Sequence, residues 1–267
     1  MNHRNRRALA CCTLTLLGLA PLHAQAPPDA STTPDAPAQA PPPADTAGVV
    51  AQAHADQEAG RYADALALLQ TPIPGAPAAA SPSDAKALRL AVADVQYAWA
   101  RSLEDDSPAL ALPHFQAALA IDRAQRPAVA ADDLNEAGIA YERLNQHSRS
   151  ADACRQALAL YGQAGDRNGE AKALDNMGIA YKYLGQYSKA IGLYQRAIVL
   201  HRQAGDKDGQ ADALDNLGLS YDALGQYGKA VGCHRQALLL FQQAGDKDGA
   251  AEARDNLDLA RKRLKSR

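Results

Sequence analysis

The side chains that most often carry chemistry occur in this sequence without a spacing typical of catalysis or metal binding. His114, His147, His201 and His234 each stand alone, with neither a second His nor a Cys at ligand spacing. The sequence shows no Gly-rich phosphate loop, no strand-turn-helix nucleophile motif and no pair of His one helical turn apart. We therefore predict a protein that is not an enzyme, has no catalytic residues and uses neither a cofactor nor a metal.

Two short acidic segments resemble the beginning of a calcium-binding loop. Residues 206–209 and 246–249 both read Asp-Lys-Asp-Gly. A calcium loop needs a third acidic ligand before its Gly, which stands at the sixth position. We interpret Asp206 and Asp246 as helix caps instead, because each follows a Gly and its carboxylate can accept hydrogen bonds from the free amides of the next helix.

The strongest pattern is an internal repeat of 40 residues. Ala171–Gln210 and Ala211–Ala250 are identical at 23 of 40 aligned positions. Within a unit the apolar residues return at intervals of three and four, as do Leu214, Leu217 and Tyr221, and this interval is the period of a helix. Glycines interrupt the pattern twice in each unit. The pattern therefore predicts two helices per unit and a stacked array of units.

The repeated positions resemble the tetratricopeptide repeat. They include the segment Leu217-Gly218-x-x-Tyr221, the Leu-Gly-Gln-Tyr turn and the small residues Ala230 and Ala237. The usual unit has about 34 residues, and the 40-residue unit resembles the longer variety found in kinesin light chains and cell-polarity adaptors. The resemblance implies an all-α fold, a right-handed α-solenoid of antiparallel helix pairs, with about five such pairs and a C-terminal capping helix.

Composition and repeat quality divide the chain into four parts. Residues 1–24 are expected to be a signal peptide, and residues 25–48 a disordered tether rich in Pro and Ala. Residues 49–130 are expected to hold two degenerate helical repeats. Residues 131–267 are expected to hold three regular 40-residue repeats and the capping helix.

The first residues are typical of an export signal. Arg4, Arg6 and Arg7 precede the apolar run 8–20, and a small residue allows cleavage before Gln25. This run is well short of the about 20 residues that span a bilayer, which disfavours the alternative of a retained membrane anchor. We expect an exported protein, periplasmic or secreted, in a Gram-negative-type bacterium, with no membrane span after cleavage.

Two cysteines remain after that cleavage, Cys154 and Cys233. They lie two repeats apart in a stack whose neighbouring helices pack about 8–10 Å from each other. A disulfide requires Cα atoms within about 7 Å. We therefore expect two buried, unpaired thiols.

The repeated glycines and tyrosines of the first helix predict a packing arrangement. We expect Gly178 and Gly218 where the two helices of a unit meet at close range, because a side chain there would hold the helices apart. We expect Tyr181 and Tyr221 to fill the gap beside them.

The charge of the chain argues against nucleic acid as a partner. The formal net charge is −2, and without the three N-terminal arginines the chain has 25 Lys and Arg against 30 Asp and Glu. Binding to nucleic acid calls for a clustered basic face. We therefore expect a protein or peptide as the partner.

The resemblance implies where that partner binds, because in this family the first helices line the concave face that holds peptides. The candidate residues on that face are Asn135, Glu136, Arg143, Lys172, Asp175, Asn176, Lys182, Tyr183, Asp212, Asp215, Asn216, Asp222, Asp255 and Asn256. The asparagines are the sharpest signal, since a side-chain amide can both donate to and accept from a peptide backbone. The acids favour a partner with basic groups. The alternative is that these Asn and Asp side chains bond to neighbouring repeats and set the curvature of the stack.

We predict a non-enzymatic scaffold of the cell envelope, or a secreted one, that binds an extended segment or a partner domain on its concave face. The alternative is an accessory or regulatory subunit of an envelope enzyme or of a secretion or assembly complex.

Overall fold

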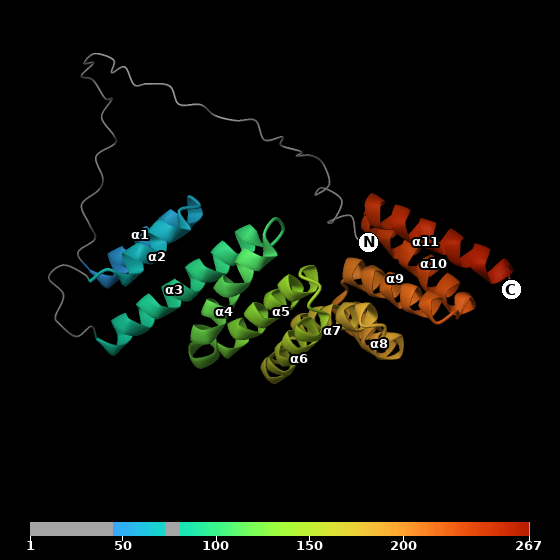
Figure 1. The fold of residues 1–267 in the computed structure, drawn as a ribbon, viewed down its shortest axis with the longest axis horizontal. Coiled ribbons are helices and arrows are strands. Elements are labelled where there is room, and N and C mark those ends of the chain that lie inside the picture. The colour runs from blue at the N-terminus through green and yellow to red at the C-terminus, as the bar shows by residue number, and fades with distance from the viewer. Residues whose placement is uncertain (1–44, 73–80, 267) are drawn as a thin grey trace, which may run out of the picture.

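The computed structural model describes residues 45–72 and 81–266, and every regular element in these ranges is an α-helix. The helices follow one another along the long axis of the molecule (Figure 1). They are α1 (Thr46–Glu58), α2 (Tyr62–Gln70), α3 (Pro82–Leu103), α4 (Pro108–Gln125), α5 (Pro127–Arg143), α6 (His147–Ala164), α7 (Arg167–Tyr183), α8 (Tyr187–Ala204), α9 (Lys207–Ala223), α10 (Tyr227–Ala244) and α11 (Lys247–Lys265). The expected signal peptide and most of the expected tether lie outside the described residues, and α1 begins at Thr46, inside the last few residues of the range 25–48.

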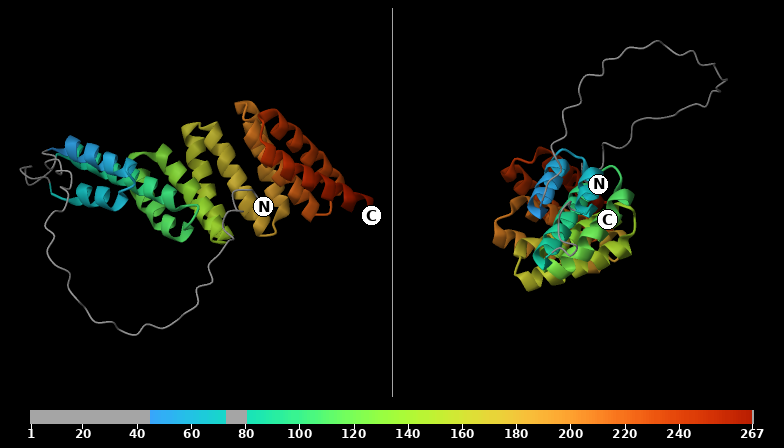
Figure 2. Two further views of the ribbon diagram at one scale, coloured as in Figure 1. Left: turned by 90° about the horizontal axis from the view of Figure 1, so that it is seen from above. Right: turned by 90° about the vertical axis from the view of Figure 1, so that its left-hand side faces the viewer.

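Five helix pairs and a final single helix form a solenoid in the described part of the chain. Each helix from α3 onward packs against the next one in sequence, and the pairs lie side by side in Figure 2. In addition, α5 contacts α7, α7 contacts α9 and α9 contacts α11. The first helices of successive units therefore lie next to each other on one face. The predicted all-α solenoid of helix pairs with a C-terminal helix is confirmed.

Glycine and aspartate set the boundary between regular units. Gly165, Gly205 and Gly245 end their helices at φ angles of 72°, 72° and 83°, in the left-handed region that favours glycine. The Asp that follows caps the next helix, and Asp206 accepts a hydrogen bond of 2.9 Å from the amide of Gly209. The equivalent Asp residues of the neighbouring units do the same. The interpretation of the Gly-Asp pairs as helix ends and caps is therefore confirmed.

The two helices of a regular unit approach closely at a glycine. Gly178 of α7 faces the ring of Tyr194 in α8, and Gly218 of α9 faces the imidazole of His234 in α10. A Cβ on Gly178 would lie 2.6 Å from Cε1 of Tyr194, which is too close for two carbon atoms. The expected close approach is therefore present. The ring directly against the glycine comes from the second helix, whereas Tyr181 of the first helix is half-buried and packs against the same cluster as Tyr194.

A second set of glycines makes the contact between one unit and the next. Near the starts of α7, α9 and α11, a glycine lies against a ring at the end of the preceding helix. The pairs are Gly169 with Tyr161, Gly209 with His201, and Gly249 with Phe241. Each regular unit thus has one glycine–side-chain contact within it and one with its neighbour, and close packing of this kind fixes the helices against one another.

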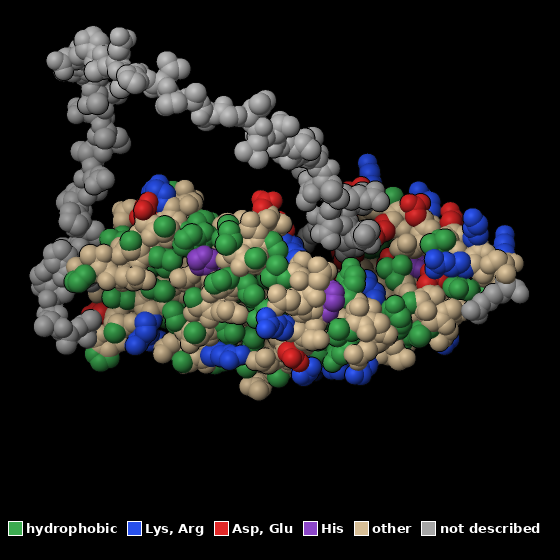
Figure 3. All heavy atoms as spheres, in the orientation of Figure 1, with side chains coloured by type: hydrophobic (Ala, Val, Ile, Leu, Met, Phe, Trp, Pro, Cys, Tyr) green, Lys and Arg blue, Asp and Glu red, His purple; other side chains and the backbone are tan. Residues whose placement is uncertain are grey.

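The last helix, α11, covers the open end of the stack. Its buried residues are Ala250, Ala253, Leu257 and Ala260. Its last turn carries Lys262, Arg263 and Lys265, and basic side chains gather at this end of the molecule in Figure 3. Positive charge suits the negative end of the helix dipole. None of the described helices is long and apolar enough to cross a bilayer.

Both cysteines of the folded region are free thiols. Cys154 is buried, and Cys233 is only half-buried. The expectation of unpaired thiols is confirmed, and the expectation of full burial holds for Cys154 alone. Burial raises the pKa of Cys154 to about 12 and that of Cys233 to about 11, so both thiols stay protonated at neutral pH.

Two buried carboxyl groups meet between α4 and α5, where the degenerate repeats join the regular ones. Asp122 and Asp133 are 1% and 0% exposed, and Nε of Arg126 lies 2.7 Å from Oδ1 of Asp122. Burial, followed by the charge of Asp122, raises the pKa of Asp133 to about 8. The pair therefore keeps a proton at neutral pH, because two carboxyl groups cannot both ionise in such a buried site.

The glycine contact within a unit can be tested by filling it. Gly178→Ala is expected to lower the free energy of unfolding by about 1–3 kcal/mol, because the added methyl group collides with the Tyr194 ring. Gly192→Ala is the matched control, since Gly192 lies on the exposed side of α8 with nothing within 4 Å. Gly192→Ala is expected to raise the free energy of unfolding by about 0.5–1 kcal/mol, because Ala has a higher helix propensity than Gly. Urea unfolding measures both, and equal effects in the two variants would contradict the packing argument.

The buried carboxyl pair predicts a pH dependence of stability. The unfolded chain releases the Asp133 proton near pH 4, whereas the folded chain keeps it until about pH 8, so stability falls as the pH rises through this interval. Asp133→Asn removes this dependence. The free energy of unfolding of the variant is expected to exceed that of the parent by about 1–3 kcal/mol at pH 8 and by little at pH 4.

Thermal unfolding across this pH range measures the effect, with Asp152→Asn on the exposed side of α6 as the control. If the thermal stability of Asp133→Asn depends on pH in the same way as that of the parent, the buried carboxyl pair holds no proton at neutral pH.

Candidate functional site

A groove of about 1080 Å³ lies along the face formed by the first helices. Its walls come from the end of α3 and the turn after it, from α5 and α7, and from the junction of α8 with α9. We call it the inner groove. It is lined by Arg101, Glu104, Asp105, Asp106, Asn135, Glu136, Ile139, Arg143, Lys172, Asp175, Asn176, Ile179, His201, Asp206, Gly209, Asp212 and Asn216.

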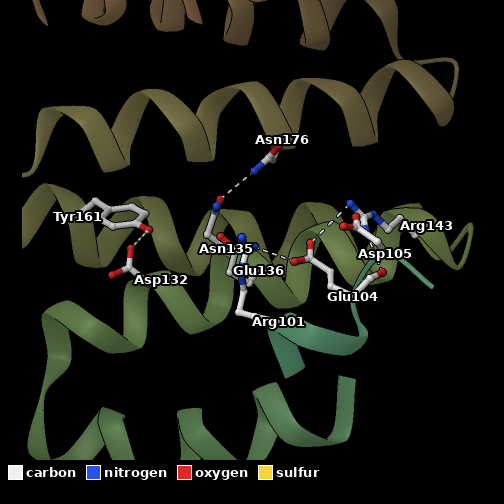
Figure 4. A network of polar contacts seen from close by, with 9 residues as sticks. All are labelled: Arg101, Glu104, Asp105, Asp132, Asn135, Glu136, Arg143, Tyr161 and Asn176. Carbon is white, nitrogen blue, oxygen red and sulfur yellow. Dashed lines mark hydrogen bonds and ion pairs between the residues drawn. The ribbon is translucent and has the colours of Figure 1, made fainter. Parts of the chain in front are cut away.

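A network of ion pairs occupies the end of the groove near α3. Nη1 of Arg101 lies 2.7 Å from carboxylate oxygens of both Glu104 and Glu136, and Nη1 of Arg143 lies 2.8 Å from Oδ1 of Asp105. Figure 4 shows these side chains pointing toward one another from α3, α5 and the turn after α3. Burial raises the pKa of Glu136, and the charge of Arg101 opposes that rise. At this end, two guanidinium groups pair with three of the four carboxylates, and Asp106 is the fourth.

The middle of the groove is polar but uncharged. Nδ2 of Asn176 on α7 donates to Oδ1 of Asn135 on α5 at 3.0 Å (Figure 4). Ile139 and Ile179, one helical turn further along, add apolar surface. A side-chain amide has two N–H groups and an oxygen with two lone pairs, so one bond leaves each amide with further donor and acceptor capacity.

The end of the groove near α9 carries a second group of carboxylates. His201 lies between two carboxylates, with Nε2 2.7 Å from Oδ2 of Asp175 and Nδ1 2.8 Å from Oδ2 of Asp206. Burial raises the pKa of Asp175 to about 6. Asp212 projects from α9 in the same region. Weak solvation within the groove, followed by the charges of Asp175 and other acids, raises its pKa to about 7.

The remaining asparagines on this face link successive repeats. Nδ2 of Asn256 on α11 donates to Oδ2 of Asp215 on α9 at 2.8 Å, and Nζ of Lys182 on α7 donates to Oδ1 of Asn216 on α9 at 2.7 Å. Burial lowers the pKa of Lys182. These bonds, with the Asn176–Asn135 bond, are those described by the alternative interpretation, in which the polar side chains join neighbouring repeats. Binding of a peptide to them stays a prediction.

Two of the candidate acids point into the protein. Oδ1 of Asp215 lies 2.6 Å from Nδ1 of His234, whose side chain is fully buried, and Oδ2 of Asp222 lies 3.5 Å from Nε2 of the same ring. Asp215 and Asp222 are 8% and 7% exposed. They therefore hold a buried histidine and do not line the inner groove.

The structure brings together eight of the candidate residues in the inner groove. They are Asn135, Glu136, Arg143, Lys172, Asp175, Asn176, Asp212 and Asn216. The other six lie outside the lining, and they are Lys182, Tyr183, Asp215, Asp222, Asp255 and Asn256. Tyr183 is exposed and stacks on His147 with ring centroids 4.9 Å apart, and Asp255 is exposed on α11. The inner groove therefore contains only part of the set of residues that helical spacing assigns to this face.

Sequence reasoning missed the part of the groove that does not come from the first helices of the regular units. Arg101, Glu104 and Asp105 belong to a degenerate unit, where the repeat pattern gives no alignment to follow. A signal for His201 and Asp206 is present in the sequence, because each regular unit has a ring-bearing residue shortly before its Gly-Asp pair. That spacing indicates a contact between the ring and the cap, but it does not indicate that the pair faces a groove.

Comparison with known proteins gives a family match for the regular units. The sequence matches the tetratricopeptide repeat family over residues 134–203 and 169–243. No curated protein sequence matches the chain.

Similar folds occur among solved structures. BtubC (BKLC) from P. vanneervenii is similar with a TM-score of 0.60 and 18% identity, over 82% of this chain and 84% of that chain. Aspartyl phosphate phosphatase F from Bacillus subtilis is similar with a TM-score of 0.61 and 14% identity, over 83% of this chain and 58% of that chain. A kinesin light chain-like protein from Podosopora anserina with nearly identical TPR-like repeats has a TM-score of 0.51 and 17% identity, over 74% of this chain and 95% of that chain. At these identities the likeness concerns the fold. Residues 134–243 thus match the tetratricopeptide repeat family, and the described helices form a solenoid similar to those of TPR-like structures.

Proposed function

We propose that this protein is a binding scaffold whose inner groove holds an extended segment of a partner protein that carries basic side chains. Tetratricopeptide repeats support a role in protein binding, and the inner groove is the hollow that the first helices form. The observation that carries the proposal is the charge of the lining, which has seven Asp and Glu against three Lys and Arg.

Carboxylates gather at both ends of the groove. Near α3, four acids face Arg101 and Arg143, which pair with three of them. Near α9, Asp175, Asp206 and Asp212 lie together with His201 and the exposed Lys172. A basic side chain placed there would relieve repulsion between carboxylates, and such complementarity favours one class of partner over another.

The centre of the groove suits the backbone of such a segment. The amide of the half-buried Asn176 retains donor and acceptor capacity after bonding to Asn135, which is itself only 4% exposed, and Ile139 and Ile179 provide apolar contact beside it. An extended chain presents its own N–H and C=O groups to both sides, so amides of this kind hold it irrespective of sequence. Basic side chains near α9 would then set the specificity.

Export is a further part of the proposal, and it rests on the sequence. The basic start, the apolar run 8–20 and the small residue before Gln25 support cleavage and release into the periplasm or the medium. The scaffold would then serve the envelope, as the binding partner of another protein there or as an accessory subunit of an envelope complex.

Peptide binding to the groove is testable with a pair of synthetic probes. An extended peptide with Lys at every second position is expected to bind, and the same peptide with Glu in place of Lys is not. Asp212→Asn is expected to weaken binding of the Lys peptide about two- to fivefold, as for a partly exposed ion pair of roughly 0.5–1 kcal/mol. Asp255→Asn, on the exposed side of α11, is the control and is expected to leave the affinity unchanged. Equal binding of both peptides, measured by isothermal titration, would contradict the proposal.

Binding of the Lys peptide is expected to depend on pH, and the same calorimetric measurement can follow this dependence. Asp212, with a pKa of about 7, is charged above that pH and takes up a proton below it. Affinity for the Lys peptide is therefore expected to fall between about pH 8 and pH 6, and Asp212→Asn is expected to flatten part of that fall. A rise in affinity toward acid pH would show that the carboxylates near α9 do not bind the peptide.

Export is expected to produce a mature protein with a defined N-terminus. In a Gram-negative host, the protein recovered from the periplasm or medium is expected to begin at Gln25, with residues 1–24 removed. Intact mass measurement gives the answer. A full-length chain held in the membrane fraction would show a retained anchor instead.

A further inference from the structure

Two histidines in the C-terminal half each lie between a pair of carboxylates. His201, near the end of α8, has Nε2 2.7 Å from Asp175 and Nδ1 2.8 Å from Asp206. The residue is 4% exposed, whereas the side chain of Asp206 is 42% exposed. Both ring nitrogens are within hydrogen-bond distance of a carboxylate oxygen, and solvent has better access to the Asp206 contact than to the Asp175 contact.

His234 on α10 repeats this arrangement one unit further along. Its ring is fully buried, with Nδ1 2.6 Å from Asp215 and Nε2 3.5 Å from Asp222. Both acids come from α9. The second contact is longer than a good hydrogen bond, but it still places a buried carboxylate opposite the second ring nitrogen.

The protonation state of both rings follows from this geometry. A neutral imidazole has one N–H and one lone pair, whereas the imidazolium ion donates from both nitrogens. With a carboxylate opposite each nitrogen, the neutral ring would turn a lone pair toward negative charge. The arrangement therefore fits an imidazolium ion at His201 that bridges two carboxylates. At His234, Asp215 bonds to one ring nitrogen and Asp222 faces the other, which has no hydrogen-bond partner.

These carboxylates also hold neighbouring helices. Asp175 belongs to α7, and Asp206 caps α9 through a hydrogen bond of 2.9 Å from the amide of Gly209. Asp215 accepts a bond of 2.8 Å from Asn256 of α11, and Arg263 of α11 lies 4.0 Å from Asp222. The two histidines thus connect α7, α8, α9, α10 and α11 through charged contacts.

We propose that His201 and His234, each with its two aspartates, form a proton-operated lock on the C-terminal half of the solenoid. With both rings charged, α7 to α11 are held as one rigid stack. Loss of the proton from either ring leaves a pair of carboxylates without the cation between them, and the helices that these carboxylates join become looser. The lock goes beyond peptide binding, because it acts in the protein alone.

The other charged groups around the two rings do not replace the imidazolium ions. In the described part of the chain, the ion pairs of Asp175 and Asp206 are both with His201. Asp212 adds further negative charge near Asp175. Near His234, the cations are Arg263, at the edge of ion-pair distance from Asp222, and Lys182, which acts on Asp215 from α7. Nearby Cys233 and Tyr194 stay neutral, because burial raises the pKa of both.

The direction of the pH effect follows from the surroundings of His201. Burial lowers the pKa of this ring, but the hydrogen bond and charge of Asp175 and the charge of Asp206 outweigh burial, and the net pKa is raised. A raised imidazole pKa stabilises the fold fully below the unfolded value of about 6.5, and this stability is lost as the pH rises through the folded pKa. The lock is therefore closed near pH 6 and open in alkali.

The equivalent positions of neighbouring units suggest substitutions that keep the ring packing but cannot form an imidazolium ion. At the position of His201, the neighbouring units have Tyr161 and Phe241, each against a glycine as His201 is. At the position of His234, the preceding unit has Tyr194, likewise against a glycine. A double variant, His201→Phe with His234→Tyr, thus places in each contact a ring that the same fold already accepts.

Hydrogen exchange of the full chain without any peptide tests the lock. Between about pH 6 and pH 8.5, and after correction for the intrinsic exchange rate, amides of α9 to α11 in the parent are expected to open more often. The increase is about tenfold for each unit by which folding raises the imidazole pKa. Amides of α5 and α6 are the internal reference. The pH range stays above 6 because Asp175 takes up a proton below it.

In the double variant the extra opening of α9 to α11 is expected to disappear. If variant and parent open equally across the range, the lock is wrong. Nuclear magnetic resonance of histidine-labelled parent protein gives a second readout that needs no variant. The ring of His201 is expected to remain imidazolium above pH 6.5, and its titration at or below that value would overturn the proposal.

Discussion

The fold depends on the close approach of helices at glycine. In each regular unit, a residue of the first helix has no side chain, and the second helix fills that space with one of its own, as Tyr194 does at Gly178. The same device joins one unit to the next, where His201 lies against Gly209. Because a closely packed contact loses its attraction when a gap of an ångström opens, these glycines fix the distance between helices and thereby the shape of the groove.

Much of the fold follows from the sequence, because the determinants are local and repeated. The alternation of apolar residues at helical spacing, with Gly205 and Asp206 at the boundary, predicts where helices end and begin, and the structure has them there. The degenerate units were harder to align, since residues 49–130 preserve the period but few of the repeated residues. The helix pairs form there regardless, because burial of an apolar face requires only the period and not the particular side chains.

The candidate site was predicted only in part, because residues equivalent in the repeat differ in their surroundings. Asp175 and Asp215 occupy the same position of successive units, yet Asp175 lines the groove and bonds to His201, while Asp215 is buried against His234. What separates them is the side chain on the facing helix, which is Tyr194 in one unit and His234 in the next. Helical spacing identifies the face on which a residue lies, but the contacts of that residue depend on a second helix that the spacing does not describe.

The side chain opposite the glycine has a consequence for assembly of the stack during folding. Units as similar as these offer many near-equivalent partners, so a second helix could dock one unit out of place and yield a mispaired array. Cys154, Tyr194 and His234 differ in volume and polarity at this single position. The space at Gly138 admits a sulfur atom, and the ring of Tyr194 there would collide or force the helices apart. One variable side chain per unit thus labels otherwise interchangeable helices and favours the correct folding register.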